Sequence, residues 1–207
     1  MNLLPKLLTF GFLMLSCFIG FAQNDYLILK DGTKVVGTVK NIHDSDVKFQ
    51  PLNNEKNKKY KATELNEFYV KTKKEKTTGT YLSKPLPKKS KPVFLFCTVR
   101  GPLSFLTFSK SQMFSAAAPA GPGGMPMSFG AGSNKTDYYL LKEHGNLIHI
   151  GSDGLFKEAK EKRKQKLAAL LEDAPDLVQE LEKEVSFNKD VIIRYVKKYN
   201  QYKSGTF

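Results

Sequence analysis

The chain has 207 residues, with 33 Lys and Arg against 20 Asp and Glu, two Cys and no Trp. This length allows one or two small domains and excludes a large multidomain enzyme. Hydrophobic residues make up 41% and charged residues 26%, close to the average of globular proteins, which excludes wholesale disorder.

Residues 1–22 have the three parts of a secretory signal peptide. Lys6 and the amino terminus supply the positive region, and Gly20 and Ala22 are the small residues before the cut. Leu7–Phe21 form an apolar stretch of 15 residues, fewer than the roughly 20 that an uncleaved membrane anchor needs. We therefore expect an exported protein, found in the periplasm, at the outer membrane or outside the cell.

The tripeptide Leu-Ser-Cys that ends at Cys17 leaves open a lipoprotein alternative, although Phe18–Phe21 continue the apolar stretch beyond it. After cleavage Cys97 is the remaining Cys, so no internal disulfide can form. Because Cys97 lies within the strand-like run VFLFCTV, we expect a buried, inert thiol and not a nucleophile.

Residues 23–71 contain five short alternating runs, which predict a small five-stranded β-barrel-like module. Asp31-Gly32 separates the first two runs and is a strong hairpin signal, because Gly accepts positive φ. Gly37, in the second run, marks the bend of a curved sheet. The string LILKDGTKVVGTVKNI resembles the first hairpin of Sm-like and SH3-like small barrels. This likeness of pattern carries no expectation of nucleic-acid binding.

Between Lys56 and Lys91 the sequence has 12 Lys and three acidic residues. The densest part, residues 72–92, contains three Pro and few apolar residues, which predicts an exposed basic linker. Two interpretations stay open: a solvated linker, or a surface that contacts anionic lipid or polysaccharide. In the second, the contact residues are Lys71, Lys73, Lys74, Lys76, Lys84, Lys88, Lys89 and Lys91.

Residues 93–207 predict an antiparallel sheet followed by helices, so the expected fold class is α+β. Two hairpins, over residues 93–108 and 137–150, form the sheet. The segment between them, residues 109–136, is rich in Gly, Ala and Pro and predicts a flexible loop. Met and Phe in this loop leave open an adaptable partner site, against a simple insertion.

Three helices are expected at the C-terminus. The first spans Leu155–Glu172, the second begins at Pro175, and the third follows Asn188. In the third, apolar residues recur with helical spacing, so one face is buried against the sheet or the other helices.

The motifs predict no catalytic residue, no cofactor and no metal site. His43 stands beside Asp44 and Asp46, which leaves open a cation site, but an Asp-rich turn is the simpler interpretation. The sequence has no Ser in a nucleophile elbow, and the Gly-rich loop lacks the Lys-Ser or Lys-Thr of a phosphate loop.

Several segments together resemble a group of exported proteins of Bacteroidetes-type bacteria that have no assigned activity. They are the leader ending in FAQ, the hairpin ILKDGTKVVGTV, the strands VRGPLSFLTF and DYYLLKEHGNLIHI, and the C-terminal run ending in Tyr199-Asn200. The chain departs from the group at Ala174, where relatives often have Cys. The resemblance implies an envelope or secreted location and no catalytic residues.

Three functional hypotheses follow. The first is a non-enzymatic envelope protein that acts as a binding or structural scaffold. The second is a peripheral adhesion module that binds anionic lipid or polysaccharide through Lys56–Lys91. The third, an exported hydrolase, lacks an evident nucleophile and base. The partner itself stays unknown at this stage, with an envelope protein and an anionic surface as the candidates.

Overall fold

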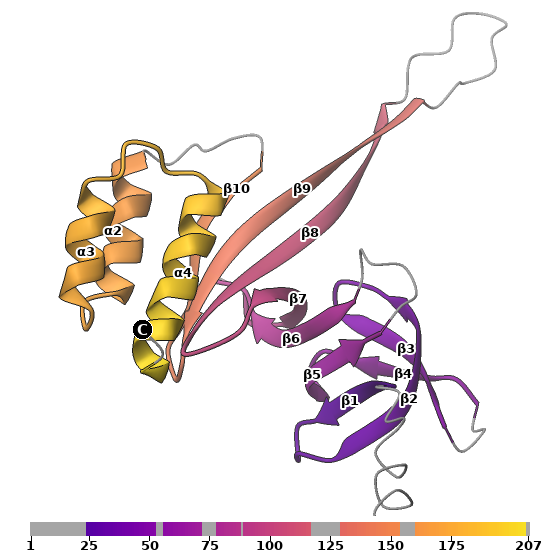
Figure 1. Ribbon diagram of the computed structural model, residues 1–207. Helices are drawn as coiled ribbons and strands as arrows, with labels where there is room; N and C mark the ends of the chain where they lie inside the picture. The colour runs from indigo at the N-terminus through magenta and orange to yellow at the C-terminus, as the bar shows by residue number, and fades with distance from the viewer. Residues whose placement is uncertain are drawn as a thin grey trace, which may run out of the picture.

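The structure is a computed structural model that describes residues 24–52, 56–71, 78–87, 89–116, 129–153 and 160–205. The signal peptide and lipidation predictions therefore lie outside the described residues. Within these residues the chain forms ten strands and three helices (Figure 1). The elements are β1 (Asp25–Leu29), β2 (Lys34–Ile42), β3 (Asp46–Pro51), β4 (Lys58–Lys61), β5 (Leu65–Val70), β6 (Gly79–Pro85), β7 (Pro92–Val99), β8 (Leu103–Ala116), β9 (Phe129–Lys142), β10 (Leu147–Ser152), α2 (Lys160–Leu170), α3 (Pro175–Glu182) and α4 (Lys189–Ser204).

All ten strands belong to one open antiparallel sheet, in the order β10-β9-β8-β7-β6-β5-β1-β2-β3-β4. The prediction of an α+β fold with C-terminal helices is confirmed. The first five strands form where the sequence predicts them, but a closed five-stranded module is not what the structure has. The reason is that β5 pairs with β6 on the side away from β1, so the sheet continues instead of closing.

The hairpin at Asp31-Gly32 forms as predicted, with Leu27 paired to Val35 across β1 and β2. Gly32 has a φ of 87°, and the Asp31 carboxylate accepts a hydrogen bond from the Thr33 N–H at 2.8 Å. Positive φ and an Asx-type hydrogen bond are the properties that make this dipeptide favourable in a tight turn.

Strand β6 runs through the middle of the segment for which the sequence predicts an exposed linker, residues 72–92. The Tyr81 ring stacks on the buried Phe68 ring of β5 with a centroid distance of 4.7 Å. On the other side, β6 pairs with β7 from Tyr81 to Pro85. The sequence does not predict this strand, because β6 is only seven residues long and the lysines and prolines on both sides of it indicate a linker.

The N-terminal strands enclose one hydrophobic core, and its residues come from β1, β3, β4, β5, β7 and the turn after β4. Its buried members are Leu27, Val47, Phe49, Tyr60, Ala62, Leu65, Phe68, Val70 and Phe94. Phe94 belongs to the segment beyond the predicted module and contacts Phe68 edge-on, with a centroid distance of 4.8 Å. The N-terminal core is thus completed by strands β6 and β7.

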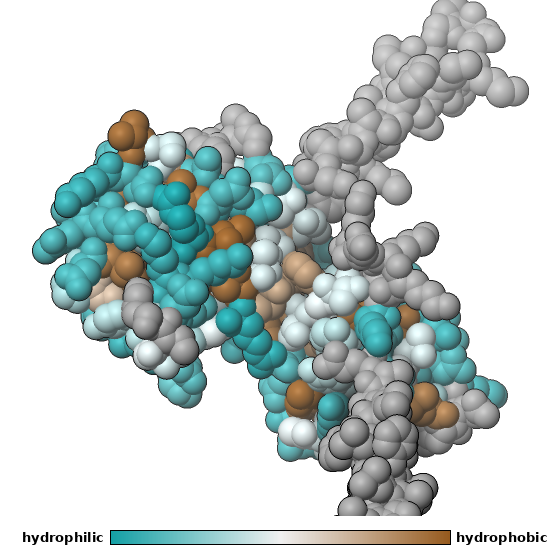
Figure 2. Space-filling view, in the orientation of Figure 1, coloured by the Kyte–Doolittle hydropathy of each residue, from teal (hydrophilic) through white to brown (hydrophobic). Residues whose placement is uncertain are grey.

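Helices α2 and α4 pack against β8–β10, and α3 packs against these two helices (Figure 1), as the helical spacing predicts. Helix α4 begins at the cap Asn188, whose side chain accepts a hydrogen bond from the Val191 N–H, and ends at Gly205 with left-handed φ. Their inner faces join the sheet in a core that includes Phe105, Leu140, Leu171 and Tyr195. Figure 2 shows mainly hydrophilic residues on the outer surface of the helices.

Strands β8 and β9 continue well beyond the helices as a two-stranded ribbon (Figure 1). Pairing extends from Leu103 and Lys142 out to Ala116 and Phe129. Much of the segment predicted to be a flexible loop, residues 109–136, is therefore paired strand, and residues 117–128 lie outside the described residues. Among the described residues, none of the helices is long and apolar enough to cross a membrane.

Candidate functional site

A groove opens where β8 separates from β7. The two strands pair only as far as Phe96 and Thr107, although β8 continues outward. Two residues before Phe96 on β7, the Phe94 N–H no longer faces β8 and instead donates a hydrogen bond to the Asp44 carbonyl at 2.9 Å. The turn between β2 and β3 has thus taken the place beside β7 that β8 leaves. The groove lies between this turn and β8.

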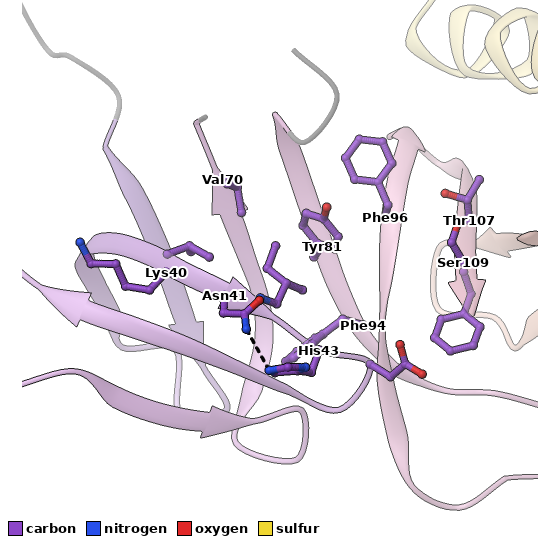
Figure 3. A pocket seen from close by; sticks show the side chains of 13 residues that line it. Lys40, Asn41, His43, Val70, Tyr81, Phe94, Phe96, Thr107 and Ser109 are labelled. Carbon is purple, nitrogen blue, oxygen red and sulfur yellow. Dashed lines mark hydrogen bonds between the residues drawn. The ribbon is translucent and has the colours of Figure 1, made fainter. Parts of the chain in front are cut away.

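The groove has a volume of about 570 Å³ and is shown in Figure 3. One wall is the end of β2 with its adjoining turn, and the other is the part of β8 from Thr107 to Ser109. Its floor comes from β5, β6 and β7. The lining residues are Val39, Lys40, Asn41, Ile42, His43, Asp44, Val70, Tyr81, Phe94, Phe96, Thr107, Phe108 and Ser109.

Aromatic rings make the floor of the groove. Tyr81 and Phe96 are half-buried and meet edge-on at a centroid distance of 5.2 Å. Burial raises the pKa of Tyr81, so its hydroxyl stays protonated at neutral pH. The Phe96 ring covers Gly79, where an added Cβ would lie 2.6 Å from the ring. Gly79 also has a φ of 150°, so both the space and the backbone conformation there require glycine.

Polar groups line the rim. The Asn41 amide nitrogen and the His43 Nε2 are 3.1 Å apart, and both residues are exposed. A cation site at His43, Asp44 and Asp46 would need the Asp46 carboxylate as its third ligand. This carboxylate instead forms an ion pair with Lys59 at 3.2 Å. In the part of the chain that the structure describes, no cluster of three His, Cys, Asp or Glu residues has a metal-binding arrangement.

Among the described residues, the lysines predicted as an anionic contact do not form one cluster. Lys71 is exposed at the end of β5, next to the start of β6, whereas Lys89 and Lys91 are exposed beyond the other end of β6. A strand of seven residues spans roughly 20 Å. Lys84 is half-buried in β6 itself. The remaining lysines of the set lie outside the described residues, and they are Lys73, Lys74, Lys76 and Lys88.

A second hollow of about 590 Å³ lies between β5, β6 and the turns at the ends of β7 and β9. Lys84 lines it, together with Arg100, Lys142 and His144. Arg100 is paired with Glu67 at 3.0 Å, and Lys142 is paired with Asp173 at 3.1 Å. Two of the basic side chains in this hollow are thus already paired with carboxylates. The hollow is therefore a weaker anion site than its residue types suggest.

A Ser and a His of β10 meet an Asp of the neighbouring strand β9. The Ser152 hydroxyl donates to the Asp137 carboxylate and lies 3.4 Å from the His149 Nε2. Asp137 faces the same nitrogen, at 3.8 Å. In a Ser-His-Asp relay the Asp holds the opposite ring nitrogen and the Ser is left to donate to the His. This arrangement is therefore a polar cross-strand contact and not a relay.

Cys97 is half-buried, and its thiol lies 3.4 Å from the Val99 carbonyl oxygen. Burial raises the pKa of this thiol to about 11. A protonated thiol is a poor nucleophile at neutral pH, although Cys97 is half-buried and not fully buried as the sequence predicts.

The sequence does not predict the groove. Tyr81 lies within the predicted linker, and the pattern identifies Phe96 and Thr107 only as strand residues. Their juxtaposition with Asn41 and His43 depends on the curl of the sheet, which leaves no local signal. Comparison with family models, with curated proteins and with solved structures finds no match.

Proposed function

We propose that the chain is an exported, non-enzymatic binding scaffold of the bacterial cell envelope, and that the groove between β2 and β8 is its binding site. The observation that carries the proposal is the half-buried aromatic floor, Tyr81 and Phe96, open to solvent beneath a polar rim. Ligand sites are typically concave and mostly apolar, with a few polar groups for orientation, at volumes of roughly 300–1,000 Å³.

Binding of a neutral apolar fluorophore, N-phenyl-1-naphthylamine, tests the groove. A neutral probe is needed because the chain has a net charge of +13, which attracts anionic dyes wherever they bind. We expect saturable binding, weakened at least fivefold (about 1 kcal/mol) by Phe96→Ala. Val185→Ala is the matched control, because Val185 is apolar, exposed and far from the groove, between α3 and α4. Equal binding by wild type and Phe96→Ala would reject this site.

Export is tested separately, by cell fractionation and mass spectrometry of the amino terminus. The support for export is the signal-peptide pattern of residues 1–22, so we expect a mature chain that begins at Gln23 in the envelope or the medium. Acylation at Cys17 would instead favour the lipoprotein alternative. An intact Met1 on cytosolic material would reject export.

A second candidate function is adhesion to anionic lipid or polysaccharide. It is favoured by the exposure of Lys71, Lys89 and Lys91, each worth about 1 kcal/mol near a charged membrane. Their placement at both ends of β6 predicts two separate points of contact. Binding to vesicles containing anionic lipid should fall steeply with added salt, and binding that is absent at low salt would remove this candidate.

A further inference from the structure

One wall of the groove is an open strand edge. Among the described residues, β8 has β9 on one side along its whole length, but β7 pairs with it only up to Thr107. From Phe108 outward, the β7 side of β8 is without a paired strand in the part of the chain that the structure describes. Phe108 and Ser109 line the groove, so the open edge begins inside it.

The open part of β8 differs in chemistry from β4, one of the two terminal strands of the sheet. Edge strand β4 reads KKYK, with three lysines in four residues, and lysines on an edge discourage pairing with another strand. The open part of β8, residues 108–116, reads FSKSQMFSA and has a single charged residue, Lys110. It contains no Pro. The edge at the groove therefore lacks the protection that β4 has.

We propose that the groove receives an extended segment of a partner protein, which adds as a strand to the open edge of β8 and places alternate apolar side chains over Tyr81 and Phe96. This rests on the proposed binding function of the groove and names the ligand class. In strand addition the main-chain hydrogen bonds supply affinity, and pockets for alternate side chains supply specificity. The groove has both parts in one place: an open edge in its wall and an aromatic floor beside it.

The partner segment should alternate apolar and polar residues, with acidic residues among the polar ones. Side chains on a strand alternate between its two faces, so one set reaches the floor while the other faces solvent. The net charge of +13 of the whole chain favours acidic over basic residues on the outward face of the segment, whereas at the rim itself Lys40 is balanced by Asp44. A small apolar molecule would use the floor and leave the edge of β8 unpaired.

The test uses the mature chain and a fluorescein-labelled ten-residue peptide in which Val or Phe alternates with Thr or Glu. Two further peptides are N-methylated at one alternate set of residues each. Along a strand, the N–H groups of alternate residues point to opposite edges, so only one set faces β8. We expect the parent peptide to bind, one methylated peptide to bind at least tenfold more weakly, and the other to bind within about threefold of the parent.

Phe96→Ala should weaken binding of the parent peptide, whereas Val185→Ala should leave its binding unchanged. Equal binding or equal weakening of both methylated peptides would overturn strand addition, since neither depends on one edge. If the neutral fluorophore binds and the peptides do not, the inference fails while the groove function stands. If neither binds, both fail. Self-association of the chain without peptide binding would assign the edge to a second copy and also overturn the inference.

Discussion

Asp25 joins three strands through its side chain. It is 7% exposed, and its two carboxylate oxygens accept hydrogen bonds from the Val39 N–H at 2.7 Å and the Lys71 N–H at 2.6 Å. The carboxylate thus ties the start of β1 to β2 and to the end of β5. Hydrogen bonds to a charged acceptor are about twice as strong as neutral ones.

Replacing Asp25 should destabilise the fold, because Asp25→Ala leaves two backbone donors without their acceptor. We expect a loss of about 2–4 kcal/mol in the free energy of unfolding, measured by urea denaturation followed by circular dichroism. Asp44→Ala is the control, since its side chain is exposed and the backbone carbonyl that holds Phe94 is retained. A loss below about 0.5 kcal/mol for Asp25→Ala would contradict the clamp.

Asp173 holds the turn between α2 and α3 against α4 and β9. The pKa of Asp173 lies well below its usual range because three groups donate hydrogen bonds to its carboxylate. The Lys203 ammonium lowers this pKa most, followed by the Tyr199 hydroxyl and the Lys142 ammonium. Tyr199 donates to both carboxylate oxygens, at 3.0 and 2.9 Å. Because the folded state lowers this pKa, the ionised carboxylate favours folding at a pH above 3.8, and the contribution is lost as the pH falls through the folded value.

Asp173→Asn should therefore cost stability at pH 7 and cost progressively less below about pH 4. Because the carboxylate is partly exposed, we expect a loss of only about 1 kcal/mol at pH 7. Urea denaturation of wild type and variant from pH 2 to pH 7 measures the difference. Glu172→Gln, at an exposed neighbouring position, is the control. A penalty for Asp173→Asn that stays constant down to pH 2 would disagree with the proposed ionisation.

Helix α4 is fastened to the sheet by an amide side chain. The Asn200 side chain accepts a hydrogen bond from the Leu103 N–H and donates one to the Leu103 carbonyl, each at 2.9 Å. It reproduces the contacts of a neighbouring strand at the start of β8. Gly101 makes this approach possible, because an added Cβ would overlap the Asn200 amide group.

Asn200→Ala should lower the free energy of unfolding by about 1–3 kcal/mol, because the Leu103 N–H and carbonyl lose their partner in a buried position. Gly101→Ala should lower the free energy of unfolding by a similar amount. The double variant should lose less than the sum of the two single losses, since Asn200→Ala already removes the amide group that the new Cβ would displace. Thermal denaturation of the single and double variants measures this. Gln201→Ala, at an exposed neighbouring position, is the control. Additive single effects would show that the two residues act independently.

Elements with a local signal were predictable from the sequence. The Asp31-Gly32 hairpin, the start of α3 at Pro175 and the cap of α4 at Asn188 all lie where their residue types indicate. Strand β6 and the groove were not predictable, because their evidence is non-local. Tyr81 is identified as a sheet residue only by its contacts with Phe68 and Phe96, which come from separate strands. The lysines around it gave a stronger local signal for a linker.

At the scale of the molecule, the N-terminal strands depend on β6 and β7. The sequence predicts a small β-barrel-like module over residues 23–71, yet the Phe68 ring contacts Tyr81 and Phe94, which lie outside that range. Strand β5 also pairs with β6 along four residues. A fragment ending at residue 71 would leave the Phe68 side of the core and one edge of β5 open.

We therefore expect residues 23–71 alone to show no cooperative thermal transition, whereas residues 23–207 show one. The physical reason is the loss of two aromatic contacts and of the β5–β6 pairing from an already small core. Circular dichroism melting of both polypeptides at equal concentration checks this, with residues 23–99 as a control that restores β6 and β7. Cooperative melting of the short fragment would establish an autonomous module.

The connectivity of the sheet has a consequence for assembly. Every pairing joins strands that are consecutive along the chain, apart from β1 with β5. Loop-closure entropy is small for such neighbours, so each hairpin can form as soon as its two strands are free to meet. A polypeptide that leaves the ribosome amino-end first can then complete most of its sheet stepwise during synthesis, and waits for its last residues only to dock α4.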